Sequence, residues 1–161
     1  MFLQNCHSSA VSIWIGGVDL ANAALLSLKN QQPFYTKEIL SVYKRNLCTM
    51  ISRIKKGSRA RIICCTQYNP FPNSPLAADW ISRLNAVTNQ VAQSCGANVA
   101  PVHKWFEGKQ AELIYGYKKG RIEDALSGPL PIHPNDRGHR AIAKGLTPYL
   151  LAKNDVTVKK K

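Results

Sequence analysis

The chain has 161 residues, of which 45% are hydrophobic, and this length and composition indicate one globular domain rather than a disordered chain. The 22 Lys and Arg residues exceed the 9 Asp and Glu residues, so the formal net charge is +13 and non-specific attraction to anionic partners is expected. No apolar run reaches the roughly 18 residues that a transmembrane helix needs, and the start of the chain lacks the pattern of a signal peptide. We therefore expect a cytoplasmic protein, or a secreted one if an N-terminal segment is missing.

The first half of the chain predicts two strands separated by two helices. The apolar run at 10–15 is typical of a buried strand and is closed by two glycines, after which a short helix is expected over 19–28. Apolar residues then fall on one helical stripe from Thr36 to Gly57. A second buried strand is predicted at 60–66.

The second half continues this alternation of strands and helices. Ser74, which precedes a proline, predicts the N-cap of a helix that reaches about Cys95. A third short strand is expected at 98–102, followed by a less regular stretch. A terminal helix over 136–151 and a basic tail over 152–161 follow it.

Strands that are apolar on both faces and alternate with helices predict an α/β fold with a parallel sheet and helices on both faces. We expect one domain over residues 1–151. Ligands of such folds bind beyond the carboxyl ends of the strands. Four segments should meet there, at 16–19, 66–74, 103–107 and 129–135. His103, which opens the third segment, has no evident partner in the sequence.

The five cysteines are Cys6, Cys48, Cys64, Cys65 and Cys95. Their odd number and the absence of a C-x-x-C motif argue against a disulfide framework and against a zinc site. Cys64 and Cys65 lie in an apolar run, so we expect buried thiols there. No bound metal is expected. The chain also lacks a glycine-rich phosphate loop, so no nucleotide cofactor is expected.

Three motifs occur in a consistent order along the chain. The sequence "IHPNDRGHRAIA" (132–143) resembles the last motif block of the SGNH hydrolases, the GDSL-type lipases and esterases, in which Asp-x-x-His-Pro-Asn precedes a helix. "WIGGVDL" (14–20) resembles their Gly-x-Asn-Asp block, and "YNPFP" (68–72) is similar to a loop of bacterial members. The resemblance covers essentially the whole chain and matches it to the C-terminal two-thirds of a family domain.

This resemblance implies a three-layer α/β/α, flavodoxin-like fold that is truncated at its N-terminus. It also implies a serine ester hydrolase that needs no metal or other cofactor and acts on short acyl esters or lipids. His133 corresponds to the catalytic base of the family. The residues that correspond to the Gly-x-Asn-Asp block, the second motif block, are Gly16, Gly17, Val18 and Asp19.

The chain departs from the family pattern at three functional positions. It contains no Gly-Asp-Ser segment, which carries the family nucleophile, Val18 replaces an oxyanion-binding Asn, and Leu130 replaces the Asp that precedes the histidine. Removing a triad serine alone lowers turnover by a factor of about 10⁶, so we expect ester hydrolysis to be absent or weak. Ser74 and Cys65 are the candidates for a stand-in nucleophile, although an N-cap and a core thiol are the simpler roles for them.

Two other interpretations stay open. One is a non-catalytic basic protein that binds nucleic acid or another anionic surface, and the other is a fragment that is completed by pairing with another chain. The first strand of the family fold lies beside the strand that 10–15 resembles, so this strand should have an unpaired, apolar edge. We therefore expect a homo-oligomer that assembles through these residues.

Overall fold

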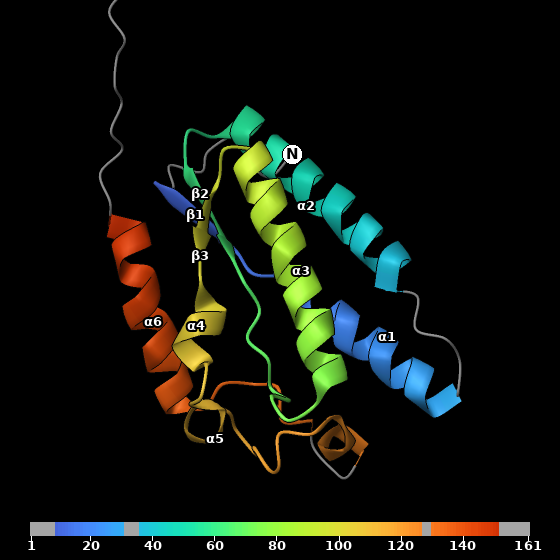
Figure 1. The fold of residues 1–161 in the computed structure, drawn as a ribbon. Helices are drawn as coiled ribbons and strands as arrows, with labels where there is room; N and C mark the ends of the chain where they lie inside the picture. The colour runs from blue at the N-terminus through green and yellow to red at the C-terminus, as the bar shows by residue number, and fades with distance from the viewer. Residues whose placement is uncertain (1–8, 31–35, 127–129, 152–161) are drawn as a thin grey trace, which may run out of the picture.

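Figure 1 shows the computed structural model, which describes residues 9–30, 36–126 and 130–151. Its strands are β1 (Ala10–Ile13), β2 (Arg61–Cys65) and β3 (Asn98–Ala100). The long helices are α1 (Gly17–Asn30), α2 (Thr36–Gly57), α3 (Pro75–Ser94) and α6 (Asp136–Leu151). The short helices α4 (Val102–Phe106) and α5 (Gln110–Leu113) and the 3-10 turn η1 (Ile122–Leu126) lie between β3 and α6. The predicted tail at 152–161 and Cys6 lie outside the described residues.

The strands form one parallel sheet in the order β1-β2-β3, which confirms the predicted parallel α/β fold. The strands are shorter than predicted. β1 ends at Ile13, because the next two residues belong to the loop that leads into α1. β3 ends at Ala100, because Pro101 has no N–H group to continue the ladder.

The side chains of β2 alternate between two hydrophobic clusters, one on each face of the sheet. Ile62 and Cys64 pack with residues of α2 and α3. Ile63 and Cys65 pack with residues of α4, α5 and α6. Figure 1 shows the same arrangement, with α2 and α3 on one side of the sheet and α6 on the other. Helices therefore cover both faces, as a strand that is apolar on both faces requires.

α3 begins where the sequence predicts. The Oγ atom of Ser74 accepts a hydrogen bond from the backbone N of Ala77 at 3.4 Å, and Pro75 occupies the first turn, where a missing N–H group costs nothing. The buried stripe of this helix contains two polar residues, Asn85 and Thr88, among its apolar ones. Both make specific hydrogen bonds to neighbouring elements.

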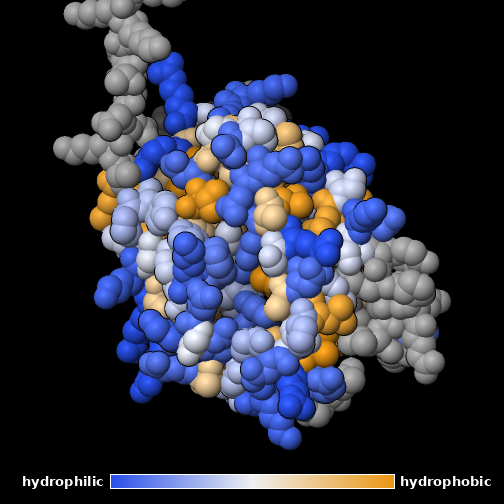
Figure 2. All heavy atoms as spheres, in the orientation of Figure 1, coloured by the Kyte–Doolittle hydropathy of each residue, from blue (hydrophilic) through white to orange (hydrophobic). Residues whose placement is uncertain are grey.

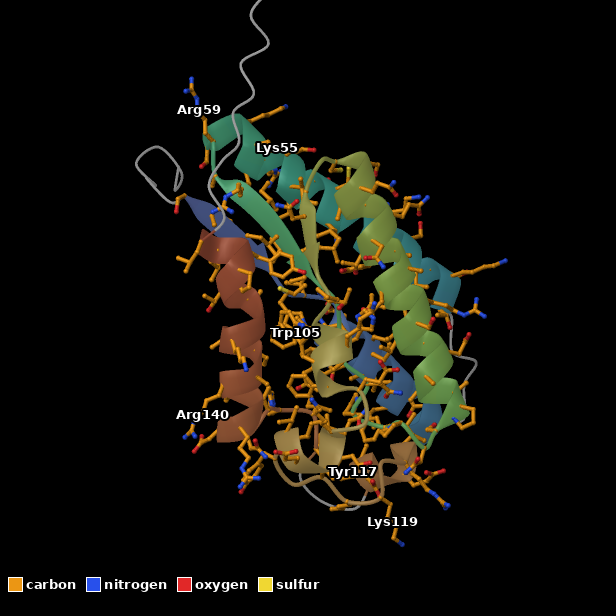
Figure 3. The ribbon with its side chains drawn as sticks, turned by 60° about the vertical axis from the view of Figure 1, so that its left-hand side comes forward. Lys55, Arg59, Trp105, Tyr117, Lys119 and Arg140 are labelled. Carbon is orange, nitrogen blue, oxygen red and sulfur yellow. The ribbon has the colours of Figure 1, made fainter. Side chains whose placement is uncertain are left out.

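α6 packs closely against α4. Trp105 projects from α4 toward α6 (Figure 3), and a Cβ atom on Gly145 would lie 2.5 Å from its indole ring, so glycine permits this approach. Ile142 is buried at the same helix face, while Arg137 and Arg140 are exposed. Within the described ranges, every helix is too short or too polar to span a bilayer.

Candidate active site

A pocket of about 330 Å³ lies at the carboxyl edge of the sheet. The loops after β1 and β2 border it through residues that include Gly16, Gly17 and Gln67. The start of α1, the first half of α3 and part of η1 add apolar walls, and the segment 130–134 brings His133 to the same cavity. Three of the four expected segments therefore meet here, whereas residues 103–107 do not line the pocket.

The lining of the pocket is mainly apolar, with Trp14, Phe71 and Trp80 as its large aromatic contributors. None of the described residues that border it is Ser, Thr, Cys, Asp or Glu, and its titratable side chains are His133 and Tyr68. Such a cavity can hold an apolar acyl group. Its described lining supplies neither a Ser, Thr or Cys nucleophile nor an acid that could orient the histidine.

Gly16 and Gly17 set the shape of the loop between β1 and α1. Gly16 has a φ of +92°, in the left-handed region that favours glycine. A Cβ atom on Gly16 would lie 2.6 Å from the ring of Tyr43, and one on Gly17 would lie 2.8 Å from Oε1 of Gln67. The two glycines therefore let this loop lie close to α2 and to the loop after β2. Val18 follows as an exposed residue in the first turn of α1.

Gln67 connects the two loops that border the pocket. Its Nε2 donates a hydrogen bond to the carbonyl O of Ile15 at 3.0 Å. Its backbone N donates to Oδ1 of Asn85 at 2.7 Å, and Nδ2 of Asn85 donates back to its carbonyl O at 2.8 Å. Asn85 is 7% exposed on α3. α3 therefore fixes the backbone of Gln67, and the Gln67 side chain fixes the end of the loop after β1.

The loop that carries His133 is anchored on both sides of this residue. The hydroxyl of Tyr68 donates a short hydrogen bond to the carbonyl O of Ile132, and the backbone N of Tyr115 donates to the carbonyl O of His133 at 2.9 Å. Tyr68 stacks on Phe106 with ring centroids 4.1 Å apart, and burial raises its pKa. The backbone of His133 is thus held in place, while its side chain is exposed at the pocket.

Asn135 connects this loop to α5 and α6. Its Oδ1 accepts a hydrogen bond from the backbone N of Gly138 at 3.0 Å and so caps α6. Its Nδ2 donates to the carbonyl O of Glu112 at 2.8 Å, and its backbone N donates to that of Leu113 at 2.9 Å. The His-Pro-Asn sequence therefore ends in a helix cap that is also bonded to α5, which accounts for the fixed position of the histidine.

Asp19 of the second motif block and the two candidate stand-in nucleophiles lie outside the pocket lining. Asp19 is exposed in the first turn of α1, and Ser74 is occupied as the cap of α3. Cys65 belongs to the cluster that faces α6, and its burial, followed by the influence of Cys64, raises its pKa to about 11. In the part of the chain that the structure describes, the ring of His133 has no hydrogen-bond partner.

His103 has a partner that the sequence does not reveal. Oγ1 of Thr66, which is buried at the end of β2, lies 2.7 Å from Nδ1 of His103 and accepts a hydrogen bond from its backbone N at 3.3 Å. Desolvation, and after it the charge of Lys104, lowers the pKa of His103. This pair joins the residue that follows β2 to α4, outside the pocket lining.

The match to a known protein family covers most of the chain. The model of the GDSL-like Lipase/Acylhydrolase family matches residues 3–141. The chain belongs to this family. Among its relatives, the spore germination lipase LipC of Bacillus licheniformis is 25% identical over 135 residues, which are 81% of this chain and 58% of the lipase.

Solved structures of lipases and esterases share the fold of this GDSL-like chain. The lipase Lip_vut3 from a goat rumen metagenome has a TM-score of 0.68 and 24% identity, covering 86% of this chain and 62% of that lipase. An acetylxylan esterase from Geobacillus stearothermophilus has a TM-score of 0.64 and 18% identity, covering 90% of this chain and 60% of the esterase. The chain thus spans less than two thirds of the length of each of these relatives.

Two residues that shape this GDSL-like pocket were not predicted, Gln67 and Asn85. Gln67 lies two residues after the end of β2, and residues in that position are the ones expected at the carboxyl edge. Asn85 falls on the buried stripe of α3, where a polar side chain needs a partner. Within the described residues, no three His, Cys, Asp or Glu side chains are grouped so that they could hold a metal ion.

Proposed function

We propose that this GDSL-like chain binds the acyl part of a carboxylic ester in the pocket beside His133 and, with its own residues, hydrolyses the ester weakly or not at all. The proposed ligands are short acyl esters or lipids. The composition of the pocket carries this proposal. His133 borders the same apolar cavity as Gly16, Gly17 and Val18, but the described lining has no Ser, Thr or Cys for the histidine to activate.

The chemistry left to these residues is limited. A histidine base accelerates acyl transfer by taking a proton from a nucleophile, and an acidic partner stabilises the imidazolium that forms. α1 begins at Gly17, so its first-turn N–H groups, which a helix leaves unpaired, lie next to the pocket and favour a negative charge there. Val18 adds no side-chain donor, and one such donor is worth roughly 3–4 kcal/mol in the transition state.

Hydrolysis is tested with p-nitrophenyl acetate and p-nitrophenyl butyrate. We expect the purified chain to turn over either ester at less than about 1 s⁻¹, which is the low end of ordinary enzyme rates. His133→Ala is the control, because it removes the histidine base among the described pocket residues without touching the anchors of its loop. Faster turnover that is lost in His133→Ala would contradict the proposal and would point to a nucleophile from Ser74, Cys65 or a second chain.

Binding without turnover is tested by tryptophan fluorescence. Of the three tryptophans, Trp14 and Trp80 line the pocket and Trp105 lies between α4 and α6. Titration with ethyl butyrate should change the emission of the chain. The change should be kept in Trp105→Phe and reduced in Trp80→Phe. An equal response of both variants would place the ligand elsewhere.

A second function, binding of nucleic acid, is favoured by one observation. Lys55, Arg59 and Arg61 border a hollow at the amino ends of the strands, away from the pocket. Figure 3 shows Lys55 and Arg59 together at that end, and hydrophilic residues predominate on the face shown in Figure 2. The chain has no evident base-reading element, so binding should be independent of base sequence and should fall steeply with salt.

This second function is tested with two labelled DNA duplexes of unrelated sequence. Affinity should be equal for both and should fall by at least tenfold between about 50 and 200 mM salt. Arg59→Glu should weaken binding, whereas Arg83→Glu on α3, outside the basic hollow, should have less effect. Binding that is unchanged by salt would contradict this function.

A further inference from the structure

Two cysteines of the α2–α3 layer lie side by side although they are 47 residues apart in the sequence. Cys48 lies in α2, and Cys95 is the C-cap residue of α3. Their Sγ atoms are 3.4 Å apart. Cys48 is exposed and Cys95 is partly exposed, so small molecules in solvent can reach the pair.

The backbone around Cys95 is held in place from two sides. Its N donates to the carbonyl O of Val91 at 2.8 Å, which continues α3 to its end. Nζ of Lys55, about two turns after Cys48 on α2, donates to the carbonyl O atoms of Cys95 and Gly96. α2 therefore binds the end of α3 through a charged side chain and keeps the two sulfur atoms in contact.

We propose that Cys48 and Cys95 form a redox-active dithiol that closes reversibly into a disulfide by exchange with a low-molecular-weight disulfide such as oxidised glutathione. The Cys48 thiolate attacks one sulfur of the small disulfide, forming an S–S bond and releasing one small thiol. Cys95 gives its proton to solvent and attacks the Cys48 sulfur, releasing the second small thiol. The protein loses two hydrogen atoms, and the small disulfide is reduced to two thiols.

The geometry requires only a small movement. A disulfide bond is about 2.05 Å long, so the sulfurs must approach by roughly 1.4 Å from their present contact. Exposure sets the order of the two steps, because Cys48 is the more accessible thiol. The pKa of Cys95 is raised by desolvation and next by its hydrogen bond to Cys48, so Cys95 is suited to the second step, as the resolving thiol.

The other two cysteines among the described residues, Cys64 and Cys65, differ from this pair in exposure. Both are buried, and burial raises the pKa of each to about 11. As successive residues of β2 they point into clusters on opposite faces of the sheet. They should not react in the folded protein, and they serve as an internal control for selectivity.

A bond between Cys48 and Cys95 closes a loop that contains β2 and α3. A cross-link over a loop of this length restricts the unfolded chain and should raise the unfolding midpoint of a domain this size by about 10 °C. The same layer carries Tyr43, whose ring supports Gly16 at the pocket. Oxidation would therefore strengthen the layer behind the pocket without placing a new group in it.

The experiment uses the full chain with Cys6→Ser, which removes the cysteine that lies outside the described residues. The protein is treated with oxidised glutathione at about pH 8 and digested with trypsin. We expect a mass lower by two hydrogen atoms and a cross-linked pair of peptides, 46–53 and 84–104. The unfolding midpoint should rise by about 10 °C and return to its first value after reduction with dithiothreitol.

Two variants separate the steps. Cys95→Ser keeps the exposed thiol and removes its partner, so the reaction should stop at a mixed disulfide between Cys48 and glutathione. Cys48→Ser should react more slowly, at Cys95. Neither variant should gain stability on oxidation. Treatment of the unfolded chain in guanidinium chloride is the matched control for proximity, and it should give a mixture of pairings that includes Cys64 and Cys65.

Three results would overturn the proposal. The first is that all four remaining thiols persist in the folded protein. The second is that the cross-linked peptides join a different pair. The third is that the oxidised protein carries only mixed disulfides with glutathione, because the sulfurs of Cys48 and Cys95 would then be in contact without reacting. If the Cys48–Cys95 bond forms but the unfolding midpoint does not change, the claim that the bond strengthens the α2–α3 layer is wrong.

Discussion

The hydroxyl of Tyr43 on α2 lies 2.8 Å from Oγ1 of Thr88 on α3, inside the interface between the two helices. Thr88 donates to the carbonyl O of Leu84 at 3.0 Å, so it accepts from Tyr43. The ring of Tyr43 also lies against Gly16, at the edge of the pocket. Tyr43 thus links α3, through its hydroxyl, to the loop of the candidate site, through its ring. The two hydroxyls are not equivalent, because that of Thr88 has a second partner.

We expect Thr88→Val to destabilise the protein by about 2–3 kcal/mol, because it leaves the buried hydroxyl of Tyr43 without a partner. Tyr43→Phe should cost about 1 kcal/mol, because Thr88 keeps its bond to Leu84. The double variant should be less destabilised than the sum of the two. Denaturant unfolding of the four proteins measures this. Costs that add within about 0.3 kcal/mol would show that the two hydroxyls do not interact.

Asn85→Leu should destabilise the protein by about 3 kcal/mol, because the backbone N–H and C=O of Gln67 both lose their partner in a partly buried place. Asn89→Leu is the matched control. It makes the same change on an exposed position of α3 and should shift stability by less than about 0.5 kcal/mol. Thermal unfolding compares the two variants. Equal losses would mean that the hydrogen bonds to Gln67 contribute little.

Alkaline pH should weaken the fold through Cys64 and Cys65. Burial raises the pKa of both from 9.0 to about 11, so the folded state holds these protons more tightly than the unfolded state. Stability is therefore complete below pH 9 and is lost as the pH rises toward 11. The loss should reach about 1.4 kcal/mol per thiol one pH unit above 9.

Denaturant midpoints from about pH 8 to about pH 10 measure this dependence. The range stops there because Tyr43 and Tyr68, whose pKa values are also raised from 10.0, add to the loss at higher pH. The double variant Cys64→Ala and Cys65→Ala should show a flatter dependence, although it is less stable overall. An equally steep dependence in that variant would assign the loss to other groups.

Within the described part of the chain β1 pairs only with β2, so no described strand pairs with the N–H and C=O groups of its other edge. We expect copies of the chain to associate through this edge. Ser12→Lys places a charge on an exposed position of β1 and should reduce the associated fraction, whereas Ser41→Lys on the exposed face of α2 should not. Light scattering at several concentrations decides this. A monomer of 17.9 kDa at high concentration would contradict the prediction.

The strands and their direction could be predicted because Ile62 to Cys65 are apolar on both faces, which only a sheet covered twice accommodates. The meeting of Gly16, Gly17 and His133 followed from the same reasoning, since the carboxyl ends of parallel strands share one edge. Strand ends were less predictable. The predicted strand at 98–102 contains Pro101, and the missing N–H group of this proline ends the ladder earlier.

Contacts between side chains of distant elements could not be predicted. The hydrogen bonds of Asn85 with Gln67 and the contact of Cys48 with Cys95 depend on how α2, α3 and the sheet are positioned along one another. Local periodicity shows which face of a helix is buried but not which residue of the next helix lies opposite. The odd number of cysteines likewise gives no information about a single pair that the fold brings together.

The register of β1 on β2 bears on how the molecule folds. Ala10 lies opposite Arg61, and closing a loop of about 50 residues costs conformational entropy before the ladder gains any hydrogen bond. α2 and α3 form from local contacts and should assemble sooner. We therefore expect β1 to join last and, as an edge strand, to leave first during partial opening. The loop with Gly16 follows β1 directly, so the pocket should exist only in the completed fold, and amide exchange at β1 should report its opening.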